Sequence, residues 1–474
     1  MSAVIVWFRR DLRLDDNPAL QAALRSGLPV VCVYVHAPDE QAPWAPGAAS
    51  RWWLHHSLAA LDADLRARGS GLLIRHGPSL QVLQSLIAQT GASEVVWNRL
   101  YEPTLVARDK QVKQQLRAHG IVAESFNAHL LFEPWEIATG AGDPYRVFTP
   151  FWRNARARLD VGTPPAAPST IDSLALADSV PLTTLALLPR IGWDAGFSAH
   201  WIPGEAGAAE LLQVFIDGAL DAYASGRDLP DRTGTSRLSP HLHFGEISPR
   251  RIVHALSARG LLAHAEPYVR ELGWREFGHH LLYHFPHTTL EPLNPQFAEF
   301  PWADDRQGEG GLHAWQQGRT GIPIVDAGMR ELWHTGWMHN RVRMIVASLL
   351  TKNLRLHWLH GARWFWDTLV DADLAANTQG WQWTAGSGAD AAPYFRIFNP
   401  VTQGERFDPE GRYVKRHVPE LARLPPKAIH QPWTLKPAER TALGLDNSGY
   451  PAPIVDLKTS REAALAAYRK MRGR

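Results

Sequence analysis

A basic segment in the second half of the chain offers side chains suited to holding a charged ligand. Helical spacing over residues 338–344 places Asn340, Arg343 and Met344 on one face. Arg341 then points elsewhere. Such a helix can present one face to a buried ligand and the other to a phosphate. A solvated basic face is the alternative interpretation of this segment taken alone.

A second segment combines carboxylates, an amide and indoles. Asp371, Asp373 and Asn377 precede a glycine-bounded turn that holds Trp381 and Trp383. These side chains suit a planar heterocycle, because the polar groups can bond its edges while indoles lie against its face. A metal at the two aspartates would need further oxygen ligands, and none is evident nearby, so we expect no metal. For any single tryptophan, core packing is the simpler interpretation.

Hydroxyl groups and histidines form two further patterns. The segment from Thr233 to Pro240 groups hydroxyls and backbone amides before an expected helix, which is a chemistry suited to pyrophosphate. Histidines are frequent after it, at positions 241, 243, 279, 280, 284 and 287. Because they have no carboxylate or thiol partners at regular spacing, we expect them to be packing or capping residues.

The first 130 residues have the alternating pattern of a doubly wound, Rossmann-like parallel sheet. Short β-branched runs predict strands at 3–8, 29–35, 72–75, 94–97 and 122–126. Helical spacing between them predicts helices at 17–25, 50–68, 80–90 and 104–119, each ending near a glycine. The turn after the first strand, Arg9 to Arg13, has no glycine fingerprint, so no dinucleotide is assigned there.

The rest of the chain divides into two parts. Residues 131–203 are rich in proline and alanine without sustained periodicity, and we interpret them as an interdomain surface linker. From residue 204 to 474 helical periods return with few β runs, which predicts an all-α domain. The expected domains are therefore 1–130, 131–203 as linker, and 204–474.

Composition excludes several classes of protein. The chain has 474 residues, of which 45% are hydrophobic and 20% charged, and no apolar run approaches the roughly 18 residues of a membrane span. The single cysteine, Cys32, excludes an intrachain disulfide framework and any cluster that needs several thiolates. The N-terminus does not resemble a secretory signal, so we expect a cytoplasmic protein. Because the net charge is only +2, affinity for phosphates must come from a local patch.

Six segments together resemble the photolyase and cryptochrome family, in the family's order and over almost the whole chain. They are residues 7–13, 235–240, 271–277, 336–344, 371–383 and 392–400. The resemblance implies an N-terminal α/β antenna domain and a helical domain that holds FAD. It also implies light-driven splitting of cyclobutane pyrimidine dimers in UV-damaged DNA, or, as the alternative, blue-light signalling without repair. Residues 241–245 and 273–286 resemble plant cryptochromes more than the best-known bacterial photolyases, which suggests bacterial class III.

The same resemblance implies two sets of residues for FAD. Those expected along its phosphates and ribityl chain are Tyr223, Thr235, Ser236, Leu238 and Ser239. Those expected at the flavin and its neighbours are Arg275, Asn340, Arg343, Asp371, Asp373 and Asn377. Arg343 and Asp371 resemble the family's ion pair, and Asn377 is expected to face the flavin N5. Since a neutral amide does not readily give up a proton, Asn377 favours the fully reduced anion that repair needs.

Residues for substrate, electron transfer and DNA are implied in the same way. The repair pocket corresponds to Glu271, Trp274, Asn340, Met344 and Trp383, in which the indoles offer π-faces to a flipped base pair. The chain of electron donors corresponds to Trp381, Trp358 and Trp315, with Trp302 as the alternative third member. Expected contacts to DNA phosphates are Arg227, Arg341 and Lys352.

The antenna is the least specified part of the resemblance. Class III similarity favours methenyltetrahydrofolate, with a deazaflavin as the alternative, in the N-terminal domain near Arg51 and Glu102. No residue there decides between them. We expect the protein to act as a monomer.

Overall fold

A five-stranded parallel sheet forms the N-terminal part of the protein. The computed structural model describes residues 2–174, 176, 178–391 and 395–473, with 305–309 as backbone only. The strand order is β3-β2-β1-β4-β5. The strands are β1 (Val4–Phe8), β2 (Val30–His36), β3 (Leu73–His76), β4 (Glu94–Asn98) and β5 (Val122–Phe126). In register, Val4 of β1 lies opposite both Val30 and Glu94.

Helices cover both faces of this sheet. They are α1 (Pro18–Arg25), α2 (Ala48–Arg66), α3 (Ser79–Thr90) and α4 (Pro103–Ala118). Alternate residues of β1 pack with α1 and α2 on one face and with α3 and α4 on the other. Asn17 caps α1 by accepting a hydrogen bond from Leu20 N, and Gly91 ends α3 at a φ of 64°. The predicted doubly wound sheet is confirmed.

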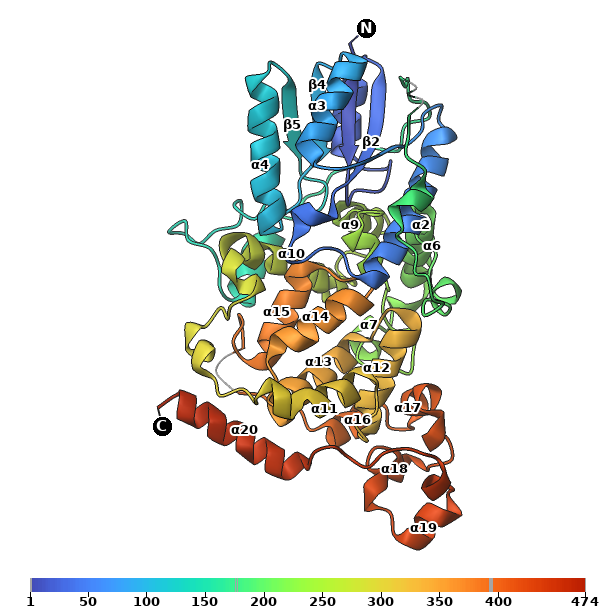
Figure 1. Cartoon of the computed structure of the whole chain (residues 1–474), viewed down its shortest axis with the longest axis vertical. Helices are drawn as coiled ribbons and strands as arrows, with labels where there is room; N and C mark the ends of the chain where they lie inside the picture. Colours follow the sequence, from blue (N-terminus) through green and yellow to red (C-terminus); the bar gives the residue numbers. More distant parts are fainter. Residues whose placement is uncertain (1, 175, 177, 392–394, 474) are drawn as a thin grey trace.

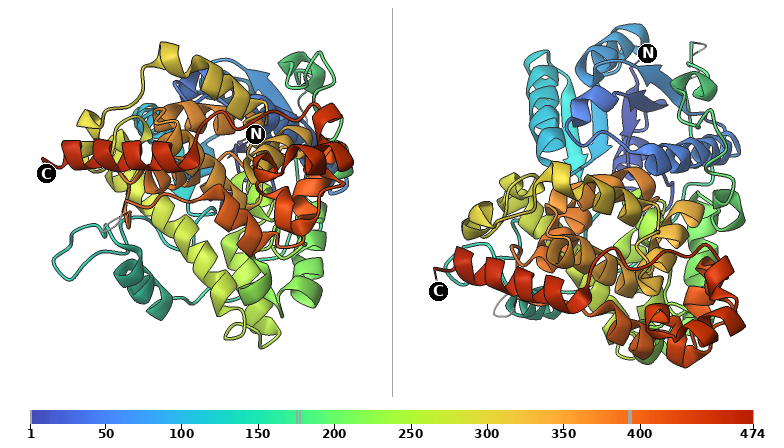
Figure 2. Two further views of the ribbon diagram at one scale, coloured as in Figure 1. Left: turned by 90° about the horizontal axis from the view of Figure 1, so that it is seen from below. Right: turned by 60° about the horizontal axis from the view of Figure 1, so that its bottom comes forward.

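The remainder of the protein is helical, as predicted. The helices are α6 (Glu205–Val214), α7 (Tyr223–Gly226), α8 (Ser239–His243), α9 (Pro249–Ala258), α10 (Glu266–His284), α11 (Asp305–Gln316), α12 (Pro323–Thr335), α13 (Asn340–Ser348), α14 (Trp358–Thr368), α15 (Leu374–Ala385), α16 (Pro400–Phe407), α17 (Arg412–His417), α18 (Pro426–Ile429), α19 (Pro437–Ala442) and α20 (Leu457–Met471). The two parts are stacked along the long axis, and α20 lies across the end of the helical part far from the sheet (Figures 1 and 2). In the described part of the chain, no helix is both long and apolar enough to span a membrane.

The range 131–203 is more than the surface linker predicted from sequence. It contains the helix α5 (Phe148–Ala157), whose Phe148, Phe151 and Trp152 are buried. These side chains pack with residues of α9 and α10. Further along, Phe197 and Trp201 belong to the core on one face of the sheet. The buried residues fall at irregular intervals between prolines, which is why no periodicity indicated them.

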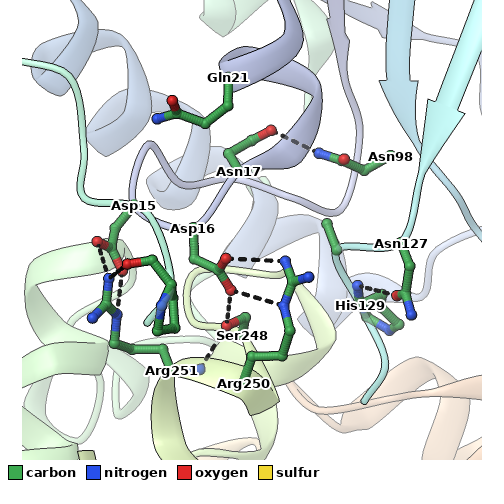
Figure 3. A network of polar contacts seen from close by, with 12 residues as sticks. Asp15, Asp16, Asn17, Gln21, Asn98, Asn127, His129, Ser248, Arg250 and Arg251 are labelled. Atoms are coloured by element: carbon green, nitrogen blue, oxygen red, sulfur yellow. Dashed lines mark hydrogen bonds and ion pairs between the residues drawn. The ribbon is translucent and has the colours of Figure 1, made fainter. Parts of the chain in front are cut away.

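A polar network joins the turn after β1 to the helical part (Figure 3). Both oxygens of Asp15 accept hydrogen bonds from Arg251 at 2.6 Å. Asp16 accepts from Arg250 at 3.0 and 3.2 Å and from the Ser248 hydroxyl at 2.5 Å. Buried Arg13 donates across the same boundary to the carbonyl of Gly245. The segment from Arg13 to Asp16 therefore fixes one part of the protein against the other.

Candidate functional site

A cavity of about 620 Å³ opens between α10, α13 and α15. Its walls include all five residues expected in the repair pocket: Glu271, Trp274, Asn340, Met344 and Trp383. They also include six residues expected at the cofactor: Ser239, Arg275, Arg343, Asp371, Asp373 and Asn377. Arg227 and Arg341 line it as well, although helical spacing predicted that Arg341 points away from the ligand. The cavity reaches far enough around α13 to include Arg341.

The ion pair of Arg343 and Asp371 has a fixed geometry. Nη2 of Arg343 lies 3.0 and 2.8 Å from the two carboxylate oxygens, and its Nε donates to the carbonyl of Met338 at 2.7 Å. The hydroxyl of Ser239 donates to Asp371 at 2.6 Å. The carboxylate of Asp371 is buried, and removing one member of such a pair typically costs about 3–5 kcal/mol. The pair is therefore a rigid polar wall.

Asp373 holds a negative charge at the start of α15. It caps this helix by accepting a hydrogen bond from Ala376 N at 2.9 Å. Although burial opposes its ionisation, His279, His243 and Arg275 hold the pKa of its carboxyl well below the usual range. Burial lowers the pKa values of His243 and His279 themselves.

Asp373 also belongs to a buried group with His129 and His279, whose possible ligand atoms all lie within 4.8 Å of one another. The positive charge of Arg275 acts on both imidazoles, which disfavours a cation among them. His129 was not singled out by the sequence, because it lies far from the other two along the chain.

Buried donors without partners point to a polar ligand in the cavity. Three residues of the cavity wall each have a buried nitrogen with no hydrogen-bond partner in the described structure. These nitrogens are Nη2 of Arg275, Nε2 of Gln379 and Nε1 of Trp381. Buried donors normally have acceptors. The amide nitrogen of Asn377 donates to the carbonyl of Ala362 at 2.9 Å. This bond fixes the orientation of the side chain and leaves its amide oxygen available to a ligand. A heterocyclic cofactor rich in acceptors, such as FAD, fits these groups.

The predicted phosphate loop is only partly at the cavity. Of its residues, Ser239 lines the cavity, whereas Thr235, Ser236 and Leu238 do not, and neither does Tyr223, which was expected beside the same phosphates. Tyr223 and Leu238 are buried in an apolar cluster, so a ligand would meet Leu238 only at its backbone. Gly234 approaches the carbonyl of Gly226 so closely that a Cβ would lie 2.4 Å from it. The loop thus depends on a glycine for its close turn.

Two aromatic rings belong to the walls of the cavity, those of Trp274 and Trp383. Trp274 is 36% exposed and stacks on Phe148 of α5, with ring centroids 3.7 Å apart and planes at 8°. Glu271, one turn earlier, pairs with Arg227 at 2.5 Å. Trp383 is on another helix, α15, and the guanidinium of Arg396 lies 5.5 Å from its ring centroid. Phe148 belongs to the supposed linker, and its place beneath Trp274 was not predicted.

The tryptophans expected to carry electrons occupy distinct positions. Trp381 and Trp358 are 2% and 1% exposed. Trp315 is fully buried, bonds the carbonyl of Val346 and lies 6.0 Å from the Trp381 ring, so it does not reach the surface. Trp302 is only partly buried, and the ring of His357 lies 5.1 Å from it and 5.7 Å from Trp358. This geometry favours the alternative, Trp302, as the outer member.

The structure contradicts the predicted phosphate contact of Lys352. This side chain is 1% exposed, its Nζ donates to the carbonyl of Ala385, and it lies 3.3 Å from the ring centroid of Phe395. Burial lowers the pKa of the amine well below its usual range. The basic run suggested a surface residue, but a π-helical turn at residues 349–353 places Lys352 inside.

Arg396 is an exposed cation beside Trp383, and it was not among the predicted contacts to DNA. It follows residues 392–394, the start of a motif segment, which lie outside the described residues. Arg227 and Arg341 are both ion-paired, Arg341 to Asp228 at 2.8 Å. Arg396 has no ion pair within the described part of the chain.

Of the two residues expected near an antenna, Glu102 forms an ion pair with Arg10 and Arg51 is exposed on α2. Arg10 lines a second cavity, of about 60 Å³, beside Tyr34 and Trp366. This volume is smaller than the range of about 300–1,000 Å³ that is usual for ligand pockets.

Comparisons with known proteins agree with this geometry. Residues 4–169 match the model of DNA photolyase, and residues 268–470 match the model of the FAD binding domain of DNA photolyase. The chain is 49% identical to the deoxyribodipyrimidine photo-lyase of Agrobacterium fabrum, over 98% of this chain and 97% of that protein. It is 42% identical to cryptochrome-1 of Arabidopsis thaliana, over 96% of this chain and 69% of that protein.

A solved structure is similar over the full length. The bacterial class III photolyase from Agrobacterium tumefaciens superimposes with a TM-score of 0.95 at 48% identity, covering 100% of this chain and 98% of that one. The chain belongs to the photolyase and cryptochrome family. Within it, the bacterial class III photolyases are the group that the chain matches.

Proposed function

We propose that the cavity between α10, α13 and α15 is where the protein repairs UV-damaged DNA in light. The chain is a deoxyribodipyrimidine photo-lyase, and the bond change it promotes is the splitting of cyclobutane pyrimidine dimers. The observation that carries the assignment of the site is that Glu271, Trp274, Asn340, Met344 and Trp383 line one cavity with the cofactor residues. No nucleophile or general base is needed.

Each pocket residue has a physical task in this proposal. Trp274 and Trp383 offer ring faces against which a flipped base pair can stack, and Phe148 stacks on Trp274. Glu271 has one oxygen committed to Arg227, which leaves the other to accept a hydrogen bond from a pyrimidine edge. Asn340 begins α13 at the cavity wall, where its amide can bond the second base.

FAD is held by the polar wall of the cavity. In our proposal Arg343 and Asp371 fix its ring, Arg275 and Gln379 use their free donors on its acceptors, and Asn377 presents an uncharged amide. When bound, the cofactor supplies an electron to the dimer on excitation and receives it back. We propose Trp381, Trp358 and Trp302 as the donors that keep it reduced.

An antenna and the cellular setting complete the proposal. Class III similarity supports methenyltetrahydrofolate over a deazaflavin. We propose Arg227, Arg341 and Arg396 as the contacts to DNA phosphates, since all three lie at or beside the cavity. We propose that the protein acts as a monomer in the cytoplasm.

The test compares damaged and undamaged DNA with variants of the pocket. The holoprotein should bind UV-irradiated oligothymidylate in the dark more tightly than the unirradiated oligomer. Trp383→Ala should remove about 1–3 kcal/mol of that preference, because one stacking face is lost. Trp135→Ala, which alters an exposed indole outside the cavity, should leave it unchanged. Equal affinity for both oligomers would favour the signalling alternative.

A further inference from the structure

The indole of Trp274 in the cavity wall continues a stack of rings that begins on α5. Phe148 lies 3.7 Å from Trp274 between ring centroids, at 8°, and Trp152 lies 6.4 Å from Phe148, at 7°. The ring of Trp152 comes so close to α10 that a Cβ on Gly273 would lie 2.4 Å from it. Because these nearly parallel rings are closely packed, the position of Phe148 sets the plane of the Trp274 ring.

The amino-terminal end of α5 needs an acceptor from another part of the chain. Val147 precedes the helix, and its side chain has no atom that could cap it. The first amides of a helix have no acceptor within the helix. Pro150 has no N–H, and the amide of Phe151 donates to the carbonyl of Val147. The N–H groups of Phe148 and Thr149 are therefore the ones that need an outside acceptor.

Asp390 supplies this acceptor to Phe148. The backbone N–H of Phe148 donates to Oδ2 of Asp390 at 2.8 Å, across 242 positions of the chain. Ala389, the residue before Asp390, lines the repair cavity. Asp390 has a φ of 54°, in the left-handed region that residues other than glycine seldom adopt. Such a conformation persists where the surroundings impose it, and it is frequent at functional sites.

We propose that Asp390 is a positioning residue for the recognition of the dimer. Its carboxylate fixes Phe148 at the start of α5, and Phe148 fixes the plane in which Trp274 meets a flipped base pair. The inference rests on the proposed function, since that function gives Trp274 its stacking task. A cap with a structural role alone would stabilise α5 without affecting the preference for damaged DNA.

The test measures binding of irradiated and unirradiated oligothymidylate to the holoprotein in the dark by fluorescence anisotropy. Asp390→Ala should lower the preference for the irradiated oligomer by about threefold or more, because the stacking face is no longer fixed. Asp390→Asn should keep the wild-type preference, since its amide oxygen still accepts and asparagine tolerates a positive φ. Asp456→Ala is the matched control and should also keep it, because Asp456 caps α20 through Thr459 N, at 2.7 Å, and does not line the cavity.

A double-mutant cycle separates positioning from a general loss of stability. If Asp390 acts through Trp274, adding Asp390→Ala to Trp274→Ala should cause no further loss of the preference. The inference is overturned, with the proposed function intact, by an unchanged preference in Asp390→Ala, by additive losses in the cycle, or by an equal loss in Asp390→Asn. Equal binding of both oligomers by wild-type protein would contradict the proposed function, and this inference with it.

Discussion

Replacing Arg396 by glutamine should make DNA binding less sensitive to salt. Each phosphate that a cation neutralises on duplex DNA contributes a slope of about −0.9 to the logarithm of affinity against the logarithm of salt concentration. Arg396 is exposed beside Trp383, a residue of the cavity wall, so we expect it to neutralise one phosphate. The slope of Arg396→Gln should therefore be shallower by about 0.9.

The buried Lys352 supplies the contrasting variant. Between about 50 and 200 mM salt, wild-type affinity for an irradiated duplex should fall about 3.5 times more than that of Arg396→Gln. Lys352→Met should keep the wild-type slope, because its amine bonds the carbonyl of Ala385 inside the protein. Arg66→Gln, at an exposed ion pair of α2, controls for a general loss of charge. Fluorescence anisotropy measures all four slopes. A shallower slope for Lys352→Met, or an unchanged one for Arg396→Gln, would refute the reasoning.

Three further predictions test other parts of the structure. Light-driven reduction of bound FAD by an external reductant should be slower in each of the variants Trp381→Phe, Trp358→Phe and Trp302→Phe. Trp315→Phe should reduce FAD at the wild-type rate. Equal rates for Trp302→Phe and wild type would contradict the assignment of Trp302 as the outer donor. Burial raises the pKa of Glu276 to about 7, so this acid binds its proton more tightly when folded, and stability is lost as pH rises from about 4.5 to 7. Glu276→Gln should reduce the fall in free energy of unfolding between pH 4.5 and 8 by about 3 kcal/mol in urea titrations, and an unchanged pH dependence would exclude this contribution. Gly361→Ala would place a Cβ 2.0 Å from the Trp381 ring. The variant should lose about 1–3 kcal/mol of folding stability, measured by thermal unfolding, and should be photoreduced more slowly. Wild-type behaviour in both assays would count against the packing described.

The fold was predictable where local pattern and tertiary position agree. The buried β-branched runs of β1, β2 and β4 and the glycine stop at Gly91 were visible in the sequence. The segment carrying Phe148 was not predicted, because its buried side chains depend on contacts with α10, far away in the chain. A helical period cannot reveal which distant surface will cover an aromatic residue.

The same limit applies to the site. The cavity residues were identified through motifs, whereas the inward position of Lys352 follows from a π-helical turn that leaves no sequence period. Trp315 was predicted as the third electron donor with Trp302 as the alternative, and only their burial favours Trp302. Charge and residue type indicate possible chemistry, but exposure determines which partner a side chain can reach.

The most direct test of the central claim is repair itself. Reduced holoprotein is incubated with UV-irradiated oligothymidylate under blue light and in the dark, and the recovery of thymine absorbance is followed. We predict recovery in light and none in the dark. No recovery in light, from protein that holds fully reduced FAD and binds the oligomer, would contradict the assignment of dimer repair to this cavity.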